Sequence, residues 1–111
     1  MSFIATLTGI LTGSQPEAAQ AWGATHYPGA MQKTATDFIL LLSEQSGLPV
    51  RQIKPTDRFI EDLKLVELES VEVIIAVEEL FKLGVADEDA ERLATVHEFI
   101  CYLHERIHSA K

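Results

Sequence analysis

Apolar residues recur at helical spacing in several segments of this chain, and no segment alternates apolar and polar residues as a strand does. The sequence therefore predicts an all-α protein. Near the N-terminus, one apolar stripe consists of Phe3, Ile4, Leu7, Ile10 and Leu11, and Gly13 is expected to end that helix. Ser14-Gln15-Pro16-Glu17 then has the form of a capping box with proline in the first turn, which predicts a short helix to about Trp22.

From residue 33 onward, the pattern predicts a compact unit of four helices. Thr34-Ala35-Thr36-Asp37 is similar to a capping box and should begin the first long helix, which Gly47 should end. A loop with two prolines, residues 48–66, leads to a second long helix over about Glu67–Lys82. The middle of that helix is apolar on most sides, so we expect neighbouring elements to cover more than one of its faces.

Two capping patterns define the remaining helices. Asp87 is expected to cap a short helix that runs through Leu93, and Thr95-Val96-His97-Glu98 is a complete capping box for the last helix. The core stripe of the last helix comprises Val96, Phe99, Ile100, Leu103 and Ile107. We therefore expect a helical extension over residues 1–32 that is packed on or docks beside a four-helix domain over residues 33–111.

Acidic residues are concentrated in one window of the sequence. The chain has a net charge of −8, and residues 57–91 hold twelve acidic and three basic residues, a net of −9. A field of this sign repels phosphate backbones, which argues against nucleic acid as a partner. The same field attracts a basic protein surface and speeds the encounter with it.

The single cysteine, Cys101, excludes a disulfide framework and indicates a reducing compartment, for which we expect the cytoplasm. No apolar run approaches the roughly 20 residues that a membrane-spanning helix needs. A signal peptide is not expected either, because no Lys or Arg precedes Lys33 and the positive leader region is missing.

Four segments in consecutive register resemble the acyl carrier protein family over about residues 33–104. Gly47, followed twelve residues later by Phe59, matches the first loop of that family. The other matching segments are residues 59–63 (Phe-Ile-Glu-Asp-Leu), 71–81 (the recognition helix with its Glu-Glu-Leu-Phe ending) and 85–96 (the third helix and the capping threonine of the fourth). The resemblance implies a bundle of three long helices and one short one, with a role in fatty acid, polyketide or related biosynthesis.

The resemblance also identifies the position on which the function depends. In that family, an Asp-Ser-Leu triplet begins the second helix, and the serine hydroxyl bears 4'-phosphopantetheine, whose thiol holds acyl groups. The corresponding triplet here is Val66-Glu67-Leu68. A carboxylate cannot replace a hydroxyl in a phosphodiester, so we expect no cofactor. Instead, Glu67 supplies a fixed negative charge near the helix N-terminus.

The leading interpretation is a non-enzymatic, carrier-like interaction protein whose acidic second helix is recognised by a partner with a basic surface. The carboxylates expected at that contact are Glu67, Glu69, Glu72, Glu78 and Glu79. The alternative depends on Ser70, one turn beyond Glu67 on nearly the same helix face, within a loosened form of the triplet. In that alternative, the chain is a working acyl or aminoacyl carrier with 4'-phosphopantetheine on Ser70.

The last helix carries a second constellation. His97, Cys101, His104 and His108 share one helix face beside the core stripe, where two or three of them could bind a soft metal. Their spacing suits two ligands at a time, so we expect boundary residues packed under the N-terminal segment and no metal site. Residues 104–108 also match the His-Glu-x-x-His pattern of metalloproteases. A peptidase is not expected, because no suitable third ligand follows and Ile107 belongs to the core stripe.

Overall fold

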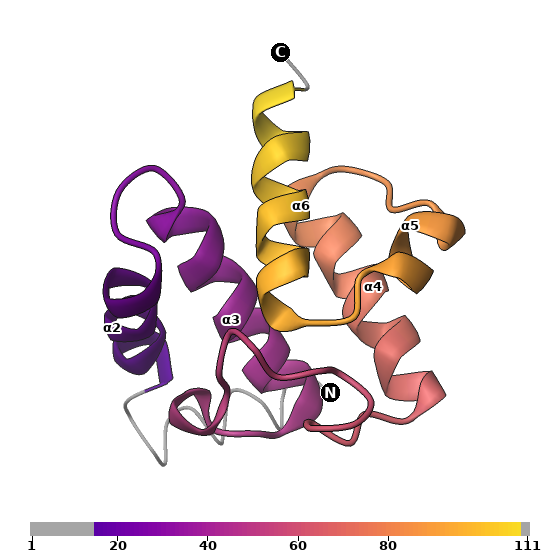
Figure 1. Cartoon of the computed structure of the whole chain (residues 1–111), viewed down its shortest axis with the longest axis horizontal. Helices are drawn as coiled ribbons and strands as arrows, with labels where there is room; N and C mark the ends of the chain where they lie inside the picture. Colours follow the sequence, from indigo (N-terminus) through magenta and orange to yellow (C-terminus); the bar gives the residue numbers. More distant parts are fainter. Residues whose placement is uncertain (1–14, 110–111) are drawn as a thin grey trace. The chain divides into compact units, whose positions relative to one another are not determined.

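A computed structural model describes residues 15–109, whose regular structure is helical apart from one isolated bridge between Arg58 and Thr95 (Figure 1). The helices are α2 (Gln15–His26), α3 (Gln32–Ser46), the 3-10 helix η1 (Val50–Gln52), α4 (Glu67–Phe81), α5 (Asp87–Arg92) and α6 (Val96–Ser109). The predicted all-α class, with three long helices and one short one after the extension, is confirmed. The helix expected over residues 3–11 lies outside the described residues.

The chain divides into two compact units, residues 1–53 and residues 54–111. The first unit contains α2, α3 and η1, and the second contains α4, α5 and α6. The boundary predicted near residue 32 falls inside the first unit, at the start of α3, and stays a prediction.

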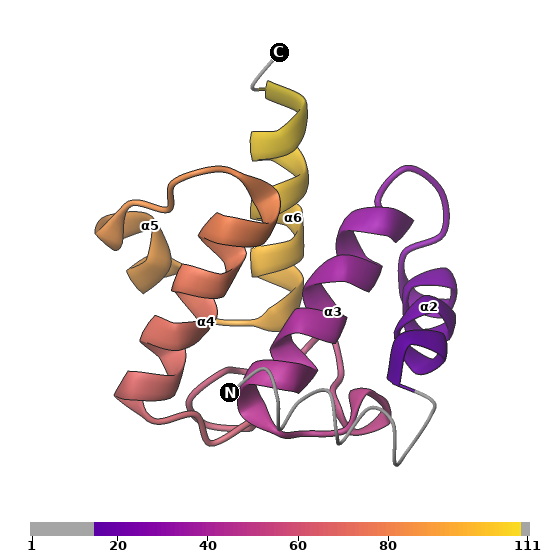
Figure 2. The ribbon, with the colours of Figure 1, turned by 180° about the vertical axis from the view of Figure 1, so that it is seen from behind.

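In the first unit, α2 packs closely against α3 because α2 has no side chain at Gly23 (Figures 1 and 2). A Cβ atom at Gly23 would lie 2.2 Å from Thr36 Oγ1 and 3.1 Å from the Gln32 carbonyl oxygen. Trp22 is buried beside this contact, and its Nε1–H donates to the Ile53 carbonyl oxygen at 2.7 Å. Part of the expected extension is therefore helical and integrated into the packing of α3.

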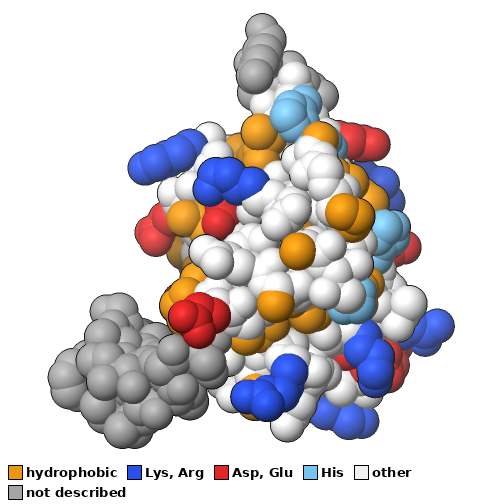
Figure 3. Space-filling model, turned by 90° about the vertical axis from the view of Figure 1, so that its left-hand side faces the viewer, with side chains coloured by type: hydrophobic (Ala, Val, Ile, Leu, Met, Phe, Trp, Pro, Cys, Tyr) orange, Lys and Arg blue, Asp and Glu red, His pale blue; other side chains and the backbone are white. Residues whose placement is uncertain are grey.

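The outward side of α2 is nearly uncharged. Within Gln15–His26, Glu17 is the one carboxylate and no Lys or Arg occurs. Uncharged side chains fill the middle of the face seen in Figure 3, which looks toward α2. This helix therefore contributes little to the acidic field that the sequence predicts.

Two of the predicted helix starts are wrong, and backbone geometry explains both. α3 begins at Gln32, because Met31 already has helical dihedrals and the Gln32 N–H bonds to the Gly29 carbonyl at 3.1 Å. Thr34 thus lies within the first turn of the helix. Asp87 is the first residue of α5 and not its cap, since the extended residue before the helix is Ala86.

The predictions for the end of α3 and the start of α6 are confirmed. Gly47 takes the left-handed conformation with φ of 79° and donates its N–H to the Ser43 carbonyl at 2.9 Å. At the start of α6, Thr95 and Glu98 make the reciprocal bonds of a capping box, each at 3.1 Å. Local hydrogen-bonding chemistry therefore fixes these two boundaries.

α6 buries most of its apolar side chains, whereas α4 leaves several of its own exposed. The stripe of α6 is buried at Val96, Phe99, Ile100 and Leu103, and half-buried at Ile107. α4 buries only Val73 and Val77, and its side chains Leu68, Val71, Ile75 and Leu80 are 47–67% exposed. Between Val73 and Val77, Ile74 and Ala76 are half-buried and Ile75 is exposed. The predicted coverage of more than one face of α4 is therefore met only in part, and α4 presents an exposed apolar surface.

Within residues 15–109, no helix has both the length and the apolar character that crossing a bilayer requires.

Candidate functional site

The helix α4 begins at Glu67, the residue that the resemblance places in register with the modified serine. Before it, Lys64 adopts a left-handed conformation with φ of 62°, and the chain enters α4 through the extended residue Val66. The Val66 side chain has no oxygen that could cap the helix, but its backbone N–H donates to Glu69 Oε1 at 3.0 Å. Glu67 and Glu69 lie in the first turn, where the helix dipole favours negative charge.

Ser70 lies in the second turn of α4 and does not begin the helix. Its backbone N–H donates to the Val66 carbonyl at 3.0 Å, as expected inside a helix. Its hydroxyl oxygen is buried and has no hydrogen-bond partner within the described residues. A modifying enzyme therefore cannot reach this hydroxyl without a local rearrangement.

The five candidate carboxylates of α4 fall into two groups. The exposed ones are Glu67, Glu72 and Glu79. Glu69 and Glu78 are half-buried and bonded to backbone N–H groups, Glu69 to Val66 and Glu78 to Val85 at 2.8 Å. The exposed group can meet a partner directly, whereas Glu78 also ties the end of α4 to the segment before α5.

A hollow of about 740 Å³ opens beside α4 within the second unit. Its walls come from the segment before α4, from α4 itself, from residues 85–94 and from Phe99 of α6. Most of the lining side chains are apolar, and three large ones among them reach the surface: Ile60 is 57% exposed, Val71 47% and Ile75 50%. The hollow is therefore open to solvent along an apolar edge.

The charged side chains that line the hollow all have the same sign. They are Glu61, Glu67, Glu78, Asp87 and Glu91. Among the described residues, no Lys, Arg or His belongs to the lining. The site thus combines an apolar interior with carboxylates around it, which favours an apolar ligand that also carries positive charge.

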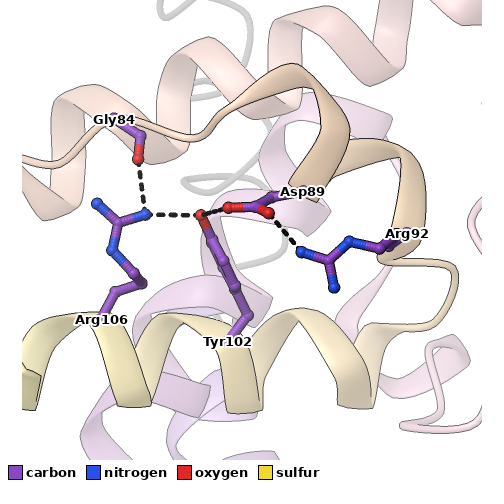
Figure 4. A network of polar contacts seen from close by, with 5 residues as sticks. All are labelled: Gly84, Asp89, Arg92, Tyr102 and Arg106. Atoms are coloured by element: carbon purple, nitrogen blue, oxygen red, sulfur yellow. Dashed lines mark hydrogen bonds and ion pairs between the residues drawn. The ribbon is translucent and has the colours of Figure 1, made fainter.

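α5 forms one wall of the hollow without burying any residue, and polar contacts hold it in place (Figure 4). The Tyr102 hydroxyl donates to Asp89 Oδ2 at 3.0 Å, and the Arg92 guanidinium pairs with Asp89 Oδ1. Arg106 Nη1 donates to the Tyr102 oxygen at 2.6 Å and to the Gly84 carbonyl at 2.9 Å. These residues connect α5, the segment before it and α6.

The same network changes two pKa values in opposite directions. The hydrogen bond from Arg92, followed by that from Tyr102, lowers the pKa of the Asp89 carboxyl. Burial, followed by the hydrogen bond to Asp89, raises the pKa of the Tyr102 phenol. At neutral pH, the pair is therefore held as a carboxylate acceptor and a neutral phenol donor.

The four residues of the α6 constellation form two pairs. Cys101 Sγ lies 3.5 Å from His97 Nε2, and the rings of His104 and His108 are 4.1 Å apart between centroids. Over the described part of the chain, no three His, Cys, Asp or Glu side chains come together as metal ligands. Burial, with a smaller effect of Glu105, raises the pKa of the Cys101 thiol, which disfavours the thiolate that a nucleophile or soft-metal ligand requires.

Sequence reasoning missed the hollow, the exposed apolar strip beside it and the network around Tyr102. A signal for the strip exists, because Leu68, Val71 and Ile75 recur at i, i+3 and i+7 on α4. The prediction of covered faces concerned the middle of α4, residues 73–77, and did not include Leu68 or Val71. The bond from Tyr102 to Asp89 had no sequence signal, since it joins α6 to α5 through the fold. Its neighbouring contacts are local, because Arg106 lies four residues after Tyr102 and Arg92 three residues after Asp89.

A comparison with known proteins shows a sequence relative of this chain. No family model matches the chain. The chain is similar to the acyl carrier protein of Helicobacter hepaticus, with 40% identity over 60 residues. The match spans 54% of this chain and 79% of that protein.

Proposed function

The chain belongs to the acyl carrier protein family, and we propose that it is a carrier-like interaction protein that is neither an enzyme nor phosphopantetheinylated. A partner protein with a basic surface recognises it through α4. Its contacts are the exposed carboxylates of α4, together with the apolar side chains between them.

One observation carries this proposal: Glu67 is the first residue of α4. The resemblance places the modified serine of the family at this position, at the mouth of the helix. A glutamate there cannot form the phosphodiester that attaches the prosthetic arm. The position nevertheless keeps negative charge at the positive end of the helix dipole, as the phosphodiester of a loaded carrier does.

The accessibility of Ser70 supports the same proposal. Modification at Ser70 requires an exposed hydroxyl, and the Ser70 hydroxyl oxygen is buried one turn inside α4. Val66 precedes Glu67 where the family has aspartate, so the aspartate next to the modified serine is also missing. The alternative of a working carrier modified at Ser70 therefore requires both a movement of the helix and a different recognition motif.

The test is a variant designed to accept the phosphopantetheine arm that the unaltered chain should not accept. The variant Val66→Asp/Glu67→Ser restores the Asp-Ser-Leu triplet at the start of α4. It is incubated with coenzyme A and a purified phosphopantetheinyl transferase of broad specificity, beside the unaltered chain and Ser70→Ala. Intact-mass spectrometry counts the prosthetic arms on each protein.

We expect one arm on the double variant and none on the unaltered chain. An arm on the unaltered chain that disappears in Ser70→Ala would establish the alternative and refute the proposal. An arm that survives in Ser70→Ala would also refute the proposal, and peptide mapping would then locate it. If only the double variant is modified, the residues at positions 66 and 67 are what prevent attachment of the arm.

A further inference from the structure

Under the proposed function, no attached acyl chain fills the hollow beside α4. Its volume of about 740 Å³ falls within the roughly 300–1,000 Å³ that is usual for ligand pockets. The exposed apolar side chains of α4 continue the apolar lining out onto the surface, where Val71 and Ile75 belong to both. A small molecule inside the hollow leaves part of this outer strip uncovered, whereas a protein segment can cover both.

Charge narrows the choice of occupant. Every charged residue that lines the hollow is a carboxylate, so a free fatty acid anion meets repulsion as its head group approaches. A second copy of this chain would bring its own acidic window, with a net charge of −9 over residues 57–91, against the first. Charge therefore disfavours an anionic lipid in the hollow, and it disfavours a second copy that docks through the same acidic window.

We propose that the hollow receives apolar side chains from a basic helical segment of the partner protein. Leucine, isoleucine or phenylalanine residues one helical turn apart enter the hollow and cover Val71 and Ile75, as in other helix-in-groove complexes. Lysine or arginine residues beside them meet the carboxylates, among them Glu61 and Glu67. This inference rests on the proposed function, because a carrier with a tethered acyl chain would use the hollow for that chain.

Two substitutions fill the hollow without removing a hydrogen bond seen in the structure. Ser70→Leu replaces an unpartnered hydroxyl with an apolar side chain at the lining. Ala90→Leu adds the same side chain from the opposite wall, on α5, and serves if the first variant does not fold. Ala24→Leu, on the exposed surface of α2, is the matched control because it adds a leucine to a helix far from the lining in sequence.

The probe is a displayed library of random 14-residue peptides, selected against the whole unaltered chain. Enriched peptides are synthesised, and their affinities are measured by fluorescence anisotropy for the unaltered chain and each variant. We expect peptides with two apolar residues at i, i+3 or i, i+4 flanked by Lys or Arg. Their binding should weaken by about tenfold or more when either leucine fills the hollow, as loss of a buried anchor requires, and should be unchanged by Ala24→Leu.

The charge variant Glu67→Gln/Glu72→Gln separates failure of this inference from failure of the proposed function. If enriched peptides lose affinity for the charge variant and bind the filled variants normally, α4 is recognised and the hollow is not used, which overturns the inference alone. If enriched peptides are neither basic nor sensitive to the charge variant, recognition through acidic α4 fails as well. A library that yields no enriched peptide also overturns the inference.

Discussion

The helices α2 and α4 have similar lengths and opposite relations to their surroundings. α2 has 12 residues, buries Ala19, Trp22 and Gly23, and carries one carboxylate. α4 has 15 residues and five carboxylates, and four of its large apolar side chains remain exposed. The more apolar of the two helices is thus the less completely packed.

This difference shows that apolar content alone does not determine burial. The backbone of α2 lies close to α3 at Gly23, and Trp22 donates a hydrogen bond to Ile53, so both contacts fix α2 to the rest of the first unit. On α4, carboxylates alternate with the apolar residues, so complete coverage would bury charges at a high cost. An exposed apolar strip among charges is typical of an interaction surface.

The largest expected effect of a mutation tests the sealing of α2. Trp22→Ala removes a buried ring and leaves the Ile53 carbonyl without its donor, which should lower the free energy of unfolding by about 3–5 kcal/mol. Leu68→Ala, at a residue that is 67% exposed on α4, should change it by no more than about 0.5 kcal/mol. Urea unfolding followed by circular dichroism measures both. Equal losses in the two variants would remove the contrast between the helices.

A smaller effect tests the close contact of α2 with α3. Gly23→Ala places a Cβ against Thr36, so the clash should outweigh the gain in helix propensity and cost about 1–2 kcal/mol net. Gly84→Ala is the matched control, since a Cβ there would meet nothing within 4 Å. Adding Thr36→Ala to Gly23→Ala should recover part of the loss in thermal melts. If the double variant melts below Gly23→Ala, the close contact is not the cause.

The smallest expected effect concerns α5, the wall of the hollow. Since the pKa of Asp89 is lowered in the folded chain, its contribution to stability is complete above the unfolded value of about 3.9 and is lost as the pH falls through the folded value. Tyr102→Phe removes one of the two donors and should move the Asp89 titration upward, toward the unfolded value. NMR titration of the Asp89 carboxyl and of the α5 amides between pH ~2 and ~6 measures this shift. Asp89→Asn should remove the acid transition of the α5 amides, and a transition that persists would assign it to another carboxyl.

Features coded by neighbouring residues were predictable from the sequence. The C-cap at Gly47, the capping box of Thr95 and Glu98, and the start of α4 at Glu67 each depend on a few consecutive residues. The start of α3 was misplaced because Met31 enters the helix without any capping side chain, so no sequence signal marks that boundary.

Features that depend on distant residues were not predictable. The burial of the Ser70 hydroxyl and the hollow require the segment before α4, α5 and Phe99 to assemble around α4. The apolar pattern of α4 was visible, but it does not distinguish a face covered by the same chain from one left for another protein. The candidate carboxylates could be named from sequence, whereas the engagement of Glu78 with Val85 appears only in the folded chain.

Because polar contacts hold α5 in place, the wall of the hollow should respond to dissolved salt. Its contacts include the ion pair of Arg92 with Asp89 at the surface, which dissolved ions screen. Sulfate and similar salts, in contrast, favour the removal of apolar surface from water. Added sulfate should therefore weaken the ion pair that helps to hold α5. It should also favour burial of the apolar lining of the hollow, so the two effects of one salt oppose each other within one site.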